Sequence, residues 1–379
     1  MKSTRLTAAF ATLVAGALSA ATDSRLYVGT YTPKGGASLG IYAVGFDSAT
    51  GALGEPVLAA RTTNPSFLAF GPDGRVLYAL DESDTGNGMG GGVAAFAVDP
   101  ARPALKLINR EMTAGASTAH LAVDATGKMV VTASYTGGQV AAFPLNADGS
   151  LGPRSAWQLS KGAPGPNKSR QESPHPHSAT FSPDNRFVYV CDLGLDKIVR
   201  YQADPSRATL APTSETATVP GAGPRHSVFS PDGSYFYVLN ELNGTVASYR
   251  CDAATGTLTP VATVSTLPAG FKGQNTCAEI ALHPNGRFLY ASNRGHDSIA
   301  VFARDAATGG LALVEIAACG GHHPRHFALS PDGAWLVCAN RDSDNLAVFK
   351  VDPATGRLAP AGHPIHVPQP VCVLFAPGK

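Results

Sequence analysis

The sequence predicts an all-β protein, a seven-bladed β-propeller closed by its own ends, from a recurring turn, the strands around it and the complementary chain termini. A Ser-Pro-Asp-Gly turn or a close variant recurs at positions 72, 125, 183, 231, 284, 331 and 377. These anchors are 53, 58, 48, 53, 47 and 46 residues apart. A repeat of about 40–50 residues with strands between the turns is the signature of a β-propeller.

Each repeat contains four candidate strands. In one copy an apolar strand at 280–282 precedes the turn and a second strand follows at 287–291. A third strand at 299–302 leads to a Thr-Gly turn of the kind also found at 253–258, which introduces the fourth strand. Four antiparallel strands make one propeller blade.

The two ends of the chain predict how the ring closes. Residues 25–31 match the second strand of a repeat and have no first strand ahead of them, whereas residues 371–378 match a first strand with nothing after it. We therefore expect the N- and C-terminal strands to pair in one blade, which also removes exposed sheet edges. Seven anchors with one shared blade give seven blades.

Residues 1–21 differ from the rest of the chain. Lys2 and Arg5 precede an apolar run at 6–18, and small residues follow at 19–21. This is the pattern of a cleavable signal peptide, and the run is short for a membrane span. The expected organisation is a signal peptide at 1–21 and one propeller domain at 22–379, exported to the periplasm or medium without a stable membrane anchor.

Composition restricts the partners. The net charge is +1 and there is no basic block, which argues against a nucleic-acid partner. We expect a monomer that binds a small molecule. Export would permit disulfides among the six cysteines, and Cys319 with Cys372 is the one pair we consider. Cys191 and Cys338 occupy equivalent strand positions in different repeats and should lie far apart. Buried free thiols are favoured.

Alignment of the repeats brings three sets of side chains to one rim of the central channel: those five and six residues before each anchor and those ten after it. The start of the first strand and the end of the second are neighbours in an antiparallel hairpin. Polar residues there interrupt apolar strands, which indicates a binding pocket, although a channel lined with polar groups and water is the alternative. The polar set comprises His177, Arg225, Arg325, His226, Glu279, His326, Glu82, Glu241, Arg294 and Arg341.

Several of these residues lie in motifs that resemble the propeller lactonase family, which includes propeller-type 6-phosphogluconolactonase and carboxy-muconate cyclase. The motifs are Tyr-Val-Gly-Thr-Tyr at 27–31, Pro-His-Ser at 176–178, Gly-Pro-Arg-His at 223–226, Asn-Glu at 240–241, Ala-Glu-Ile at 278–280, Asn-Arg at 293–294 and Pro-Arg-His-Phe at 324–327. The resemblance implies a lactonase whose catalytic residues are His177, Arg225, Glu241 and Arg294. The remaining rim residues are then expected to bind substrate: His226, Glu279, Arg325, His326, Arg341 and Glu82.

Hydrolysis of a lactone requires an activated water and stabilisation of the oxyanion. His177 or Glu241 is the candidate base, His177 without a large pKa shift, and Arg225 and Arg294 are candidates to hold the oxyanion. We expect no cofactor and no metal site. The same groups suit a muconate-type cycloisomerase, and a propeller that binds a ligand or protein without catalysis is the third hypothesis.

Competing motifs are weak. The Gly-x-Ser-x-Gly match at 36–40 lacks the strand-to-helix turn of a serine hydrolase, and the glycine-rich segment 86–92 lacks the helix of a phosphate loop. The pairs His175/His177 and His322/His323 lack the spacing expected of metal ligands. We expect the loop at 161–174, which is rich in glycine, proline and charge, to cover the channel mouth near His177.

Overall fold

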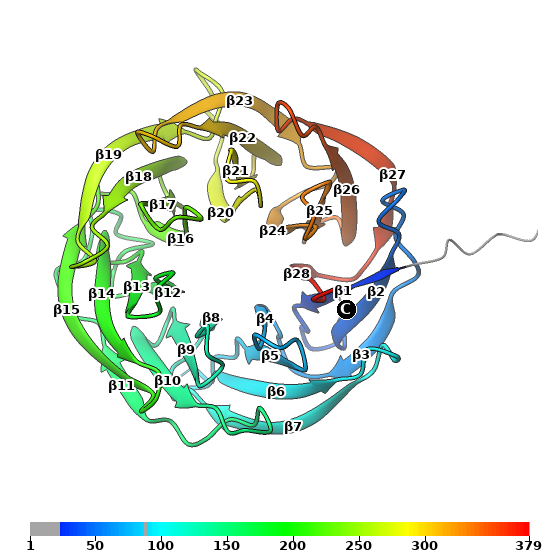
Figure 1. The fold of residues 1–379 in the computed structure, drawn as a ribbon, viewed down its shortest axis with the longest axis horizontal. Coiled ribbons are helices and arrows are strands. Elements are labelled where there is room, and N and C mark those ends of the chain that lie inside the picture. The colour runs from blue at the N-terminus through cyan, green and yellow to red at the C-terminus, as the bar shows by residue number, and fades with distance from the viewer. Residues whose placement is uncertain (1–22, 87–88, 379) are drawn as a thin grey trace, which may run out of the picture.

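Seven four-stranded antiparallel sheets form a ring around a central channel (Figure 1). The computed structural model describes residues 23–86 and 89–378, and within these ranges every regular element is a strand. The predicted all-β, seven-bladed architecture is confirmed. The expected signal peptide lies outside the described residues.

The first and second strands of each blade, counted from the channel, surround the Pro-Asp-Gly turns. The first strands are β28 (Pro370–Phe375), β4 (Leu68–Phe70), β8 (Thr118–Val123), β12 (Pro176–Phe181), β16 (Pro224–Phe229), β20 (Thr276–Leu282) and β24 (Pro324–Leu329). The second strands are β1 (Ser24–Thr30), β5 (Val76–Asp81), β9 (Met129–Ser134), β13 (Phe187–Asp192), β17 (Tyr235–Asn240), β21 (Phe288–Arg294) and β25 (Trp335–Asn340).

The outermost strand is the least buried in each blade, as expected where the middle strands pack against neighbouring blades on both faces. β17 is buried along its whole length, whereas β15 is largely exposed. The third strands are β2 (Gly40–Phe46), β6 (Gly92–Val98), β10 (Gln139–Pro144), β14 (Lys197–Asp204), β18 (Thr245–Cys251), β22 (Ser298–Arg304) and β26 (Asn345–Val351). The outermost are β3 (Val57–Arg61), β7 (Leu105–Met112), β11 (Ala156–Leu159), β15 (Thr209–Ala217), β19 (Leu258–Ser265), β23 (Leu311–Ala318) and β27 (Leu358–His366).

The ring closes as the termini predict. β28 pairs antiparallel with β1, and this blade has the order β28-β1-β2-β3. A hydrophobic cluster joins the closing blade to its neighbour, with Val28 and Val373 on one side and Trp335 and Val348 on the other. The indole Nε1 of Trp335 also donates a hydrogen bond of 2.8 Å to the carbonyl oxygen of Ser48.

The recurring turn has a local cause. In the copy at 330–333 the Ser330 hydroxyl bonds Asp332, and the Gly333 amide donates to the Ser330 carbonyl at 2.8 Å. Gly333 has φ 74°, a left-handed conformation that glycine adopts without steric cost. The turn therefore fixes the hairpin between the first and second strands in the blades where these strands are consecutive in the chain.

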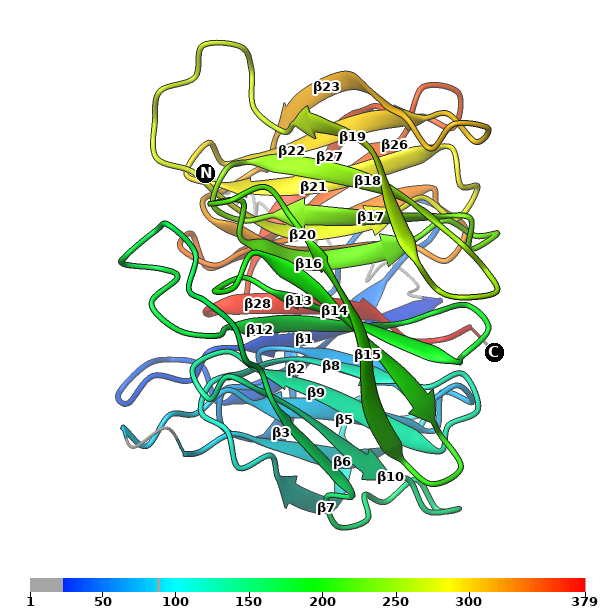
Figure 2. The same ribbon diagram turned by 90° about the vertical axis from the view of Figure 1, so that its left-hand side faces the viewer.

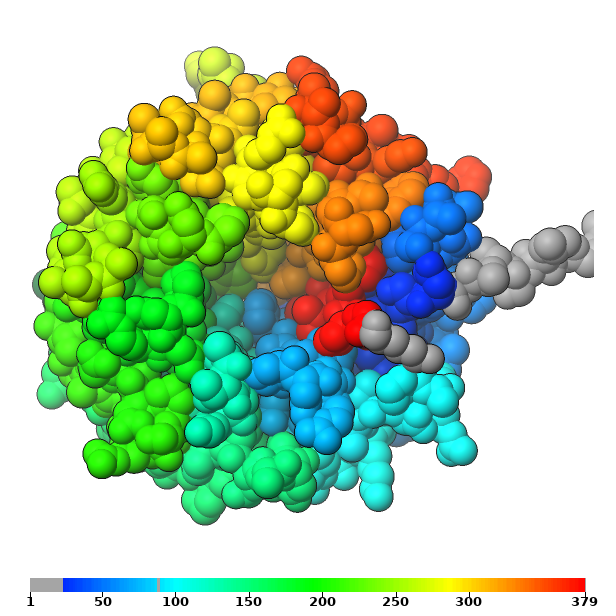
Figure 3. Space-filling view, in the orientation of Figure 1, coloured from blue at the N-terminus to red at the C-terminus, as the bar shows by residue number. Residues whose placement is uncertain are grey.

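The two faces of the ring differ. The longer loops, among them those near residues 31–39, 161–174 and 266–275, project together on the left of Figure 2, and the C-terminal end lies on the opposite side. Figure 3 shows that opposite face, hollowed at its centre beside the C-terminal end. No helix among the described residues is long and apolar enough to cross a membrane.

All six cysteines lie in the described part of the chain and are free. Cys319 and Cys372, the pair considered from the sequence, belong to different hydrophobic clusters. Burial raises the pKa of both thiols, which keeps them protonated and unreactive at neutral pH.

Candidate active site

β-bulges place the predicted residues at the rim of the channel. The strand register shifts between Pro224 and His226 in β16, and the same irregularity occurs at the start of β12 and β24. A bulge adds one residue that has no partner on the adjacent strand and re-aims its side chain. The extra residues in these three strands are His177, Arg225 and Arg325.

The bulge in β16 explains how two consecutive side chains share one site. In a regular strand Arg225 and His226 would point to opposite faces of the sheet. Instead, Nη1 of Arg225 lies 3.2 Å from Nε2 of His226. The two aligned positions before each anchor therefore both contribute to the rim.

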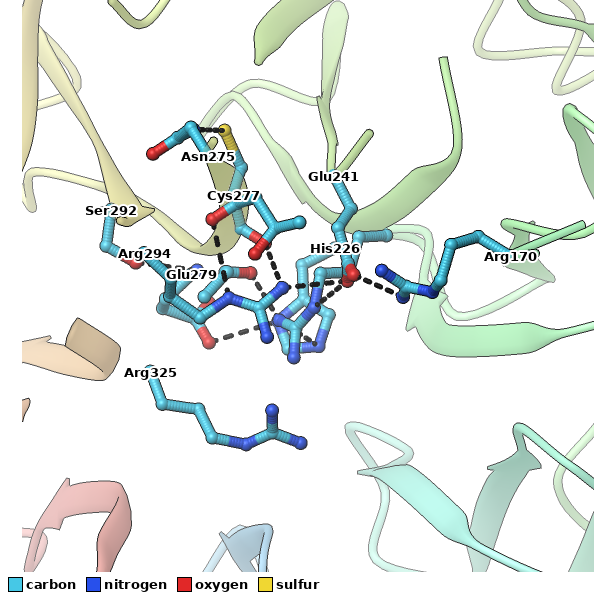
Figure 4. A network of polar contacts seen from close by, with 12 residues as sticks. Arg170, His226, Glu241, Asn275, Cys277, Glu279, Ser292, Arg294 and Arg325 are labelled. Atoms are coloured by element: carbon cyan, nitrogen blue, oxygen red, sulfur yellow. Dashed lines mark hydrogen bonds and ion pairs between the residues drawn. The ribbon is translucent and has the colours of Figure 1, made fainter. Parts of the chain in front are cut away.

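Glu241 is the centre of an ionic network (Figure 4). It follows β17, and its Oε2 lies 2.9 Å from Nε of Arg225 and 3.0 Å from Nη2 of Arg294. Its Oε1 lies 2.5 Å from Nη2 of Arg170. Burial alone would raise the pKa of Glu241, but the charges of the three arginines outweigh it and hold that pKa at about 2. Glu241 is therefore a stable carboxylate that positions arginines and a poor proton acceptor at neutral pH.

Arg225 and Arg294 are further fixed by backbone carbonyl groups. Arg225 donates to the carbonyl of Ala278, and Nη2 of Arg294 donates to the carbonyl of Cys277 at 2.7 Å. Burial and the neighbouring Arg294 lower the pKa of Arg225 to about 9. Both guanidinium groups are therefore charged at neutral pH and held in one geometry.

A second carboxylate, Glu279 of β20, lies between two imidazoles. Its Oε2 is 3.0 Å from Nδ1 of His226 and 3.2 Å from Nε2 of His326. Nε2 of His226 faces a guanidinium and Nδ1 of His326 accepts the Val373 amide, so each ring is neutral and donates its one N–H to Glu279. Burial lowers the pKa of both histidines and raises that of Glu279.

His177 is the neutral base candidate. Its ring is buried, with ring centroids 5.6 Å from Tyr135 and 5.1 Å from His226. Nδ1 has no hydrogen-bond partner among the described residues. Burial, reinforced by the charge of Arg225, lowers the pKa of His177 well below 6.5. The expectation that His177 would show no large pKa shift is therefore wrong, because it overlooked how deeply the ring is enclosed.

Phe67 marks the point at which the blades converge. Its ring centroid lies 4.2 Å from that of His120, 5.8 Å from His226 and 5.5 Å from His326. These three histidines come from three other blades. An aromatic and imidazole layer therefore fills the centre of the ring beside the arginines.

Arg325 and Glu82 form a looser part of the cluster with Tyr31. The guanidinium of Arg325 lies over the Tyr31 ring at 5.1 Å, and its Nη2 is 3.7 Å from Glu82. The Tyr31 hydroxyl donates to Oε2 of Glu82 at 3.0 Å. In Figure 4 the Arg325 guanidinium extends toward the network without an ion pair to it. This cation is the least tightly paired in the site.

The structure does not bring Arg341 into this cluster. Its Nε lies 2.6 Å from the carboxylate of Asp342, and its Nη2 lies 3.4 Å from Nδ1 of His323. The neighbouring acidic residue holds the guanidinium at the partly exposed edge of the rim. Arg341 therefore lies at the edge of the rim, in contact with His323.

Sequence alignment of the repeats missed Arg170, which lies on the loop at 161–174. Besides Glu241, its Nη2 contacts the Tyr135 hydroxyl at 3.3 Å. Tyr135 in turn stacks on His175 with a centroid distance of 4.1 Å and an interplanar angle of 7°. The expected covering loop thus contributes a cation to the site. The sequence offered one indication of this residue, an arginine six positions before the Pro-His-Ser motif.

Charge counting defines what the site can accept. Its histidines are neutral, and no group of three or more His, Cys, Asp or Glu side chains in the described ranges is arranged to hold a metal. The charged members are the cations Arg170, Arg225, Arg294 and Arg325 and the carboxylates Glu82, Glu241 and Glu279. The surplus of one positive charge favours an anionic group or a developing oxyanion.

Comparison with known proteins identifies the family. The family model described as lactonase, 7-bladed β-propeller, matches residues 25–375. The chain belongs to this lactonase family. It is 39% identical over 349 residues to 6-phosphogluconolactonase of Bacillus subtilis (strain 168), an alignment covering 92% of this chain and 97% of that protein. A 6-phosphogluconolactonase of Formosa agariphila is 34% identical over 309 residues, with 80% and 85% covered.

Solved structures of similar proteins agree with this family assignment. The periplasmic gluconolactonase PpgL of Pseudomonas aeruginosa superimposes with a TM-score of 0.87 at 35% identity, covering 94% of this chain and 99% of that one. The resemblance stated from the motifs is confirmed, and membership of this family confirms the predicted enzyme class, a carboxylic ester hydrolase of the lactonase type.

Proposed function

We propose that the protein hydrolyses a sugar-type or acidic lactone to the open-chain hydroxy acid at the mouth of the channel. The observation that carries the proposal is a neutral, buried imidazole, His177, beside guanidinium groups fixed by Glu241 in a member of a lactonase family. A base and cationic groups suited to hold an oxyanion are the two requirements of ester hydrolysis by water.

In the proposed mechanism His177 accepts a proton from water as the water oxygen attacks the lactone carbonyl. Arg225 and Arg294 stabilise the tetrahedral oxyanion. The intermediate then collapses: the carbon–oxygen bond of the ring ester breaks, and protonated His177 returns the proton to the departing ring oxygen. One lactone and one water give one hydroxy acid, whose new carboxylate the arginines can bind.

The remaining predicted residues have supporting parts in this proposal. Glu241 positions the arginines, because a carboxylate with a pKa of about 2 is a weak base. Glu279 fixes the tautomers of His226 and His326, and Arg325 with Glu82 borders the substrate. Arg341 lies at the edge of the site, beside His323.

Names of relatives guide the choice of substrate and location. Two relatives are called 6-phosphogluconolactonase and one structural neighbour is a periplasmic gluconolactonase. We therefore propose a gluconolactone-type substrate, and a mature, monomeric protein exported to the periplasm or medium after removal of residues 1–21.

The test is proton release in weak buffer with 6-phosphogluconolactone, gluconolactone and a muconolactone, after subtraction of spontaneous opening. Saturable opening of a gluconolactone supports the proposal. Formation of muconolactone from the open muconate would instead establish the cycloisomerase. Absence of turnover with all three would favour the non-catalytic propeller.

A further inference from the structure

A pocket of about 630 Å³ opens beside the Glu241 network. It falls within the range of about 300–1,000 Å³ that ligand pockets occupy. Loops from three consecutive blades and the loop at 161–174 form its wall. Its lining residues are Asn167, Ser169, Arg170, Leu242, Gly273, Gln274, Asn275, Thr276, Arg294, Gly295 and His323.

The charge of this wall is one-sided. It contains two guanidinium groups and five uncharged polar side chains other than His323, and no lining residue is acidic. Arg170 and Arg294 also contact Glu241. Each arginine therefore pairs with Glu241 and also borders the pocket. The pocket thus lies directly beside the proposed reaction centre.

His323 is held in the wall by an unusual backbone. Its φ is 60°, a left-handed conformation that is uncommon for a residue other than glycine and is concentrated at functional sites. The carboxylate of Asp297 accepts its amide at 2.8 Å, and its carbonyl accepts the Arg341 amide at 3.1 Å. Two flanking contacts thus maintain a conformation that the residue itself disfavours.

The His323 ring has unused hydrogen-bonding capacity. Nδ1 accepts a hydrogen bond of 3.4 Å from Nη2 of Arg341 and lies 3.3 Å from a carboxylate oxygen of Asp342, so the proton of the neutral ring is on Nε2. This Nε2–H is buried without a partner among the described residues. An unpaired buried polar atom is costly unless a ligand or water satisfies it. The free ring nitrogen and the two guanidinium groups border the same pocket.

The pocket wall is also shaped by a close backbone approach. Gly295, directly after β21, has φ 111°, and a Cβ there would lie 2.3 Å from the Gln274 carbonyl oxygen. Glycine therefore lets the loop at 273–276 pack against the strand end that carries Arg294. The pocket is a built feature of the strand ends and of the loop between β19 and β20.

We propose that this pocket is a subsite for an anionic substituent of the lactone, a phosphate monoester or a carboxylate, bound by Arg170, Arg294 and His323. The inference rests on the proposed lactone hydrolysis and adds where the far end of the substrate binds. Guanidinium groups bind such oxyanions well. Glu241 keeps both arginines in place, because each of them also pairs with its carboxylate.

Titration calorimetry with open-chain acids tests the subsite without requiring turnover. The probes are 6-phosphogluconate, glucarate and gluconate, which differ in carrying a phosphate, a carboxylate or a hydroxyl at the far end. The wild-type protein should bind at least one of the first two at least tenfold more tightly than gluconate, and the stronger of the two identifies the group. Equal affinity for all three, or no binding, overturns the subsite.

The decisive variant is His323→Gly, because glycine adopts φ 60° without strain, and His323→Asn provides a second folded variant. Either should lose about tenfold in affinity for the anionic acid and leave gluconate binding unchanged. His322→Gly is the matched control, since its side chain is 74% exposed and outside the pocket. Equal weakening of all three acids by His323→Gly would overturn the proposal. If no lactone reacts but the anionic acid still binds more tightly than gluconate, the proposed hydrolysis is refuted and the anion subsite stands.

Discussion

Arg170 reaches Glu241 from the loop at 161–174, with Nη2 of the arginine 2.5 Å from Oε1 of the carboxylate. The other two partners of Glu241 come from blade strands, β16 and β21. One buried carboxylate therefore couples a surface loop to the rigid ring. The position of this loop therefore bears on Glu241 and, through that carboxylate, on Arg225 and Arg294.

Replacement of Arg170 by alanine should impair activity more than folding. Its side chain is 36% exposed, so loss of the ion pair should change the free energy of unfolding by no more than about 1 kcal/mol. Turnover should fall about tenfold, since Glu241 and Arg294 lose their support and the pocket loses a cation. Steady-state kinetics and chemical denaturation measure the two effects. Lys168→Ala, an exposed change on the same loop, is the control, and equal losses in both variants would contradict the assignment.

Glu241→Gln should destabilise the fold strongly. The substitution leaves Arg225 and Arg294 buried without a counter-charge, and breaking such a buried pair costs about 3–5 kcal/mol. Denaturant unfolding measures this free energy. A Glu82→Gln variant, whose nearest cation is 3.7 Å away, should lose far less. Similar stability of Glu241→Gln and the wild type would show that the network contributes little.

Stability should decrease in two steps as the pH is lowered. The buried histidines His120, His177 and His226 have pKa values below 6.5 in the folded protein, so their contribution is present above pH 6.5 and is lost as the pH falls through and below that value. Glu241 has a depressed pKa, so its contribution is complete above 4.5 and is lost toward pH 2. When the free energy of unfolding of Glu241→Gln is measured across this pH range, the histidine step should remain and the step between pH 4.5 and 2 should disappear. A second step of unchanged size in that variant would assign it to other carboxylates.

Glu279→Gln tests whether the second buried carboxylate, and not His177, serves as the base. Burial raises the pKa of Glu279, which would suit it to accept a proton. We assign it to orientation of His226 and His326, so the amide variant should retain turnover within about tenfold and keep the pH profile of the wild type. Loss of turnover comparable to that of a His177 variant, together with loss of the acid limb of the pH–rate profile, would assign the base to Glu279 instead.

Deletion of residues 370–379 should prevent folding. It removes β28, which pairs with β1 and supplies Val371, Val373 and other buried side chains to the closing blade. The deletion leaves sheet edges unpaired and exposes them to aggregation. Soluble yield and circular dichroism measure the outcome, with removal of residues 378–379 as the control. A folded, soluble deletion variant would show that closure is dispensable.

The repeat pattern allowed the fold to be predicted, because each Pro-Asp-Gly turn has its own local cause and does not depend on distant contacts. The rim residues were predicted for a related reason: equivalent positions in equivalent blades converge on the channel. His226 and Glu279 confirm this, since residues 53 positions apart in the chain contact each other through aligned sites.

Three features depended on tertiary contacts that the repeats do not encode. Arg170 lies in the connection between β11 and β12, which is longer than the equivalent connections between the other blades. Arg341 occupies the position equivalent to Glu241, but the adjacent Asp342 holds its guanidinium at the edge. The lowered pKa of His177 arises from enclosure and from the charge of Arg225, neither of which is visible in a strand pattern.

The central claim is that His177 activates water for lactone opening, and the rate of enzymatic opening of gluconolactone and 6-phosphogluconolactone by His177→Ala tests it most directly. The control is His363→Ala, an exposed histidine on β27. The account predicts that turnover above the spontaneous rate falls at least a hundredfold in His177→Ala, in line with the contribution of a general base of about 10²–10⁴-fold, while the control and the melting temperature are unchanged. Undiminished turnover in a folded His177→Ala protein would contradict it.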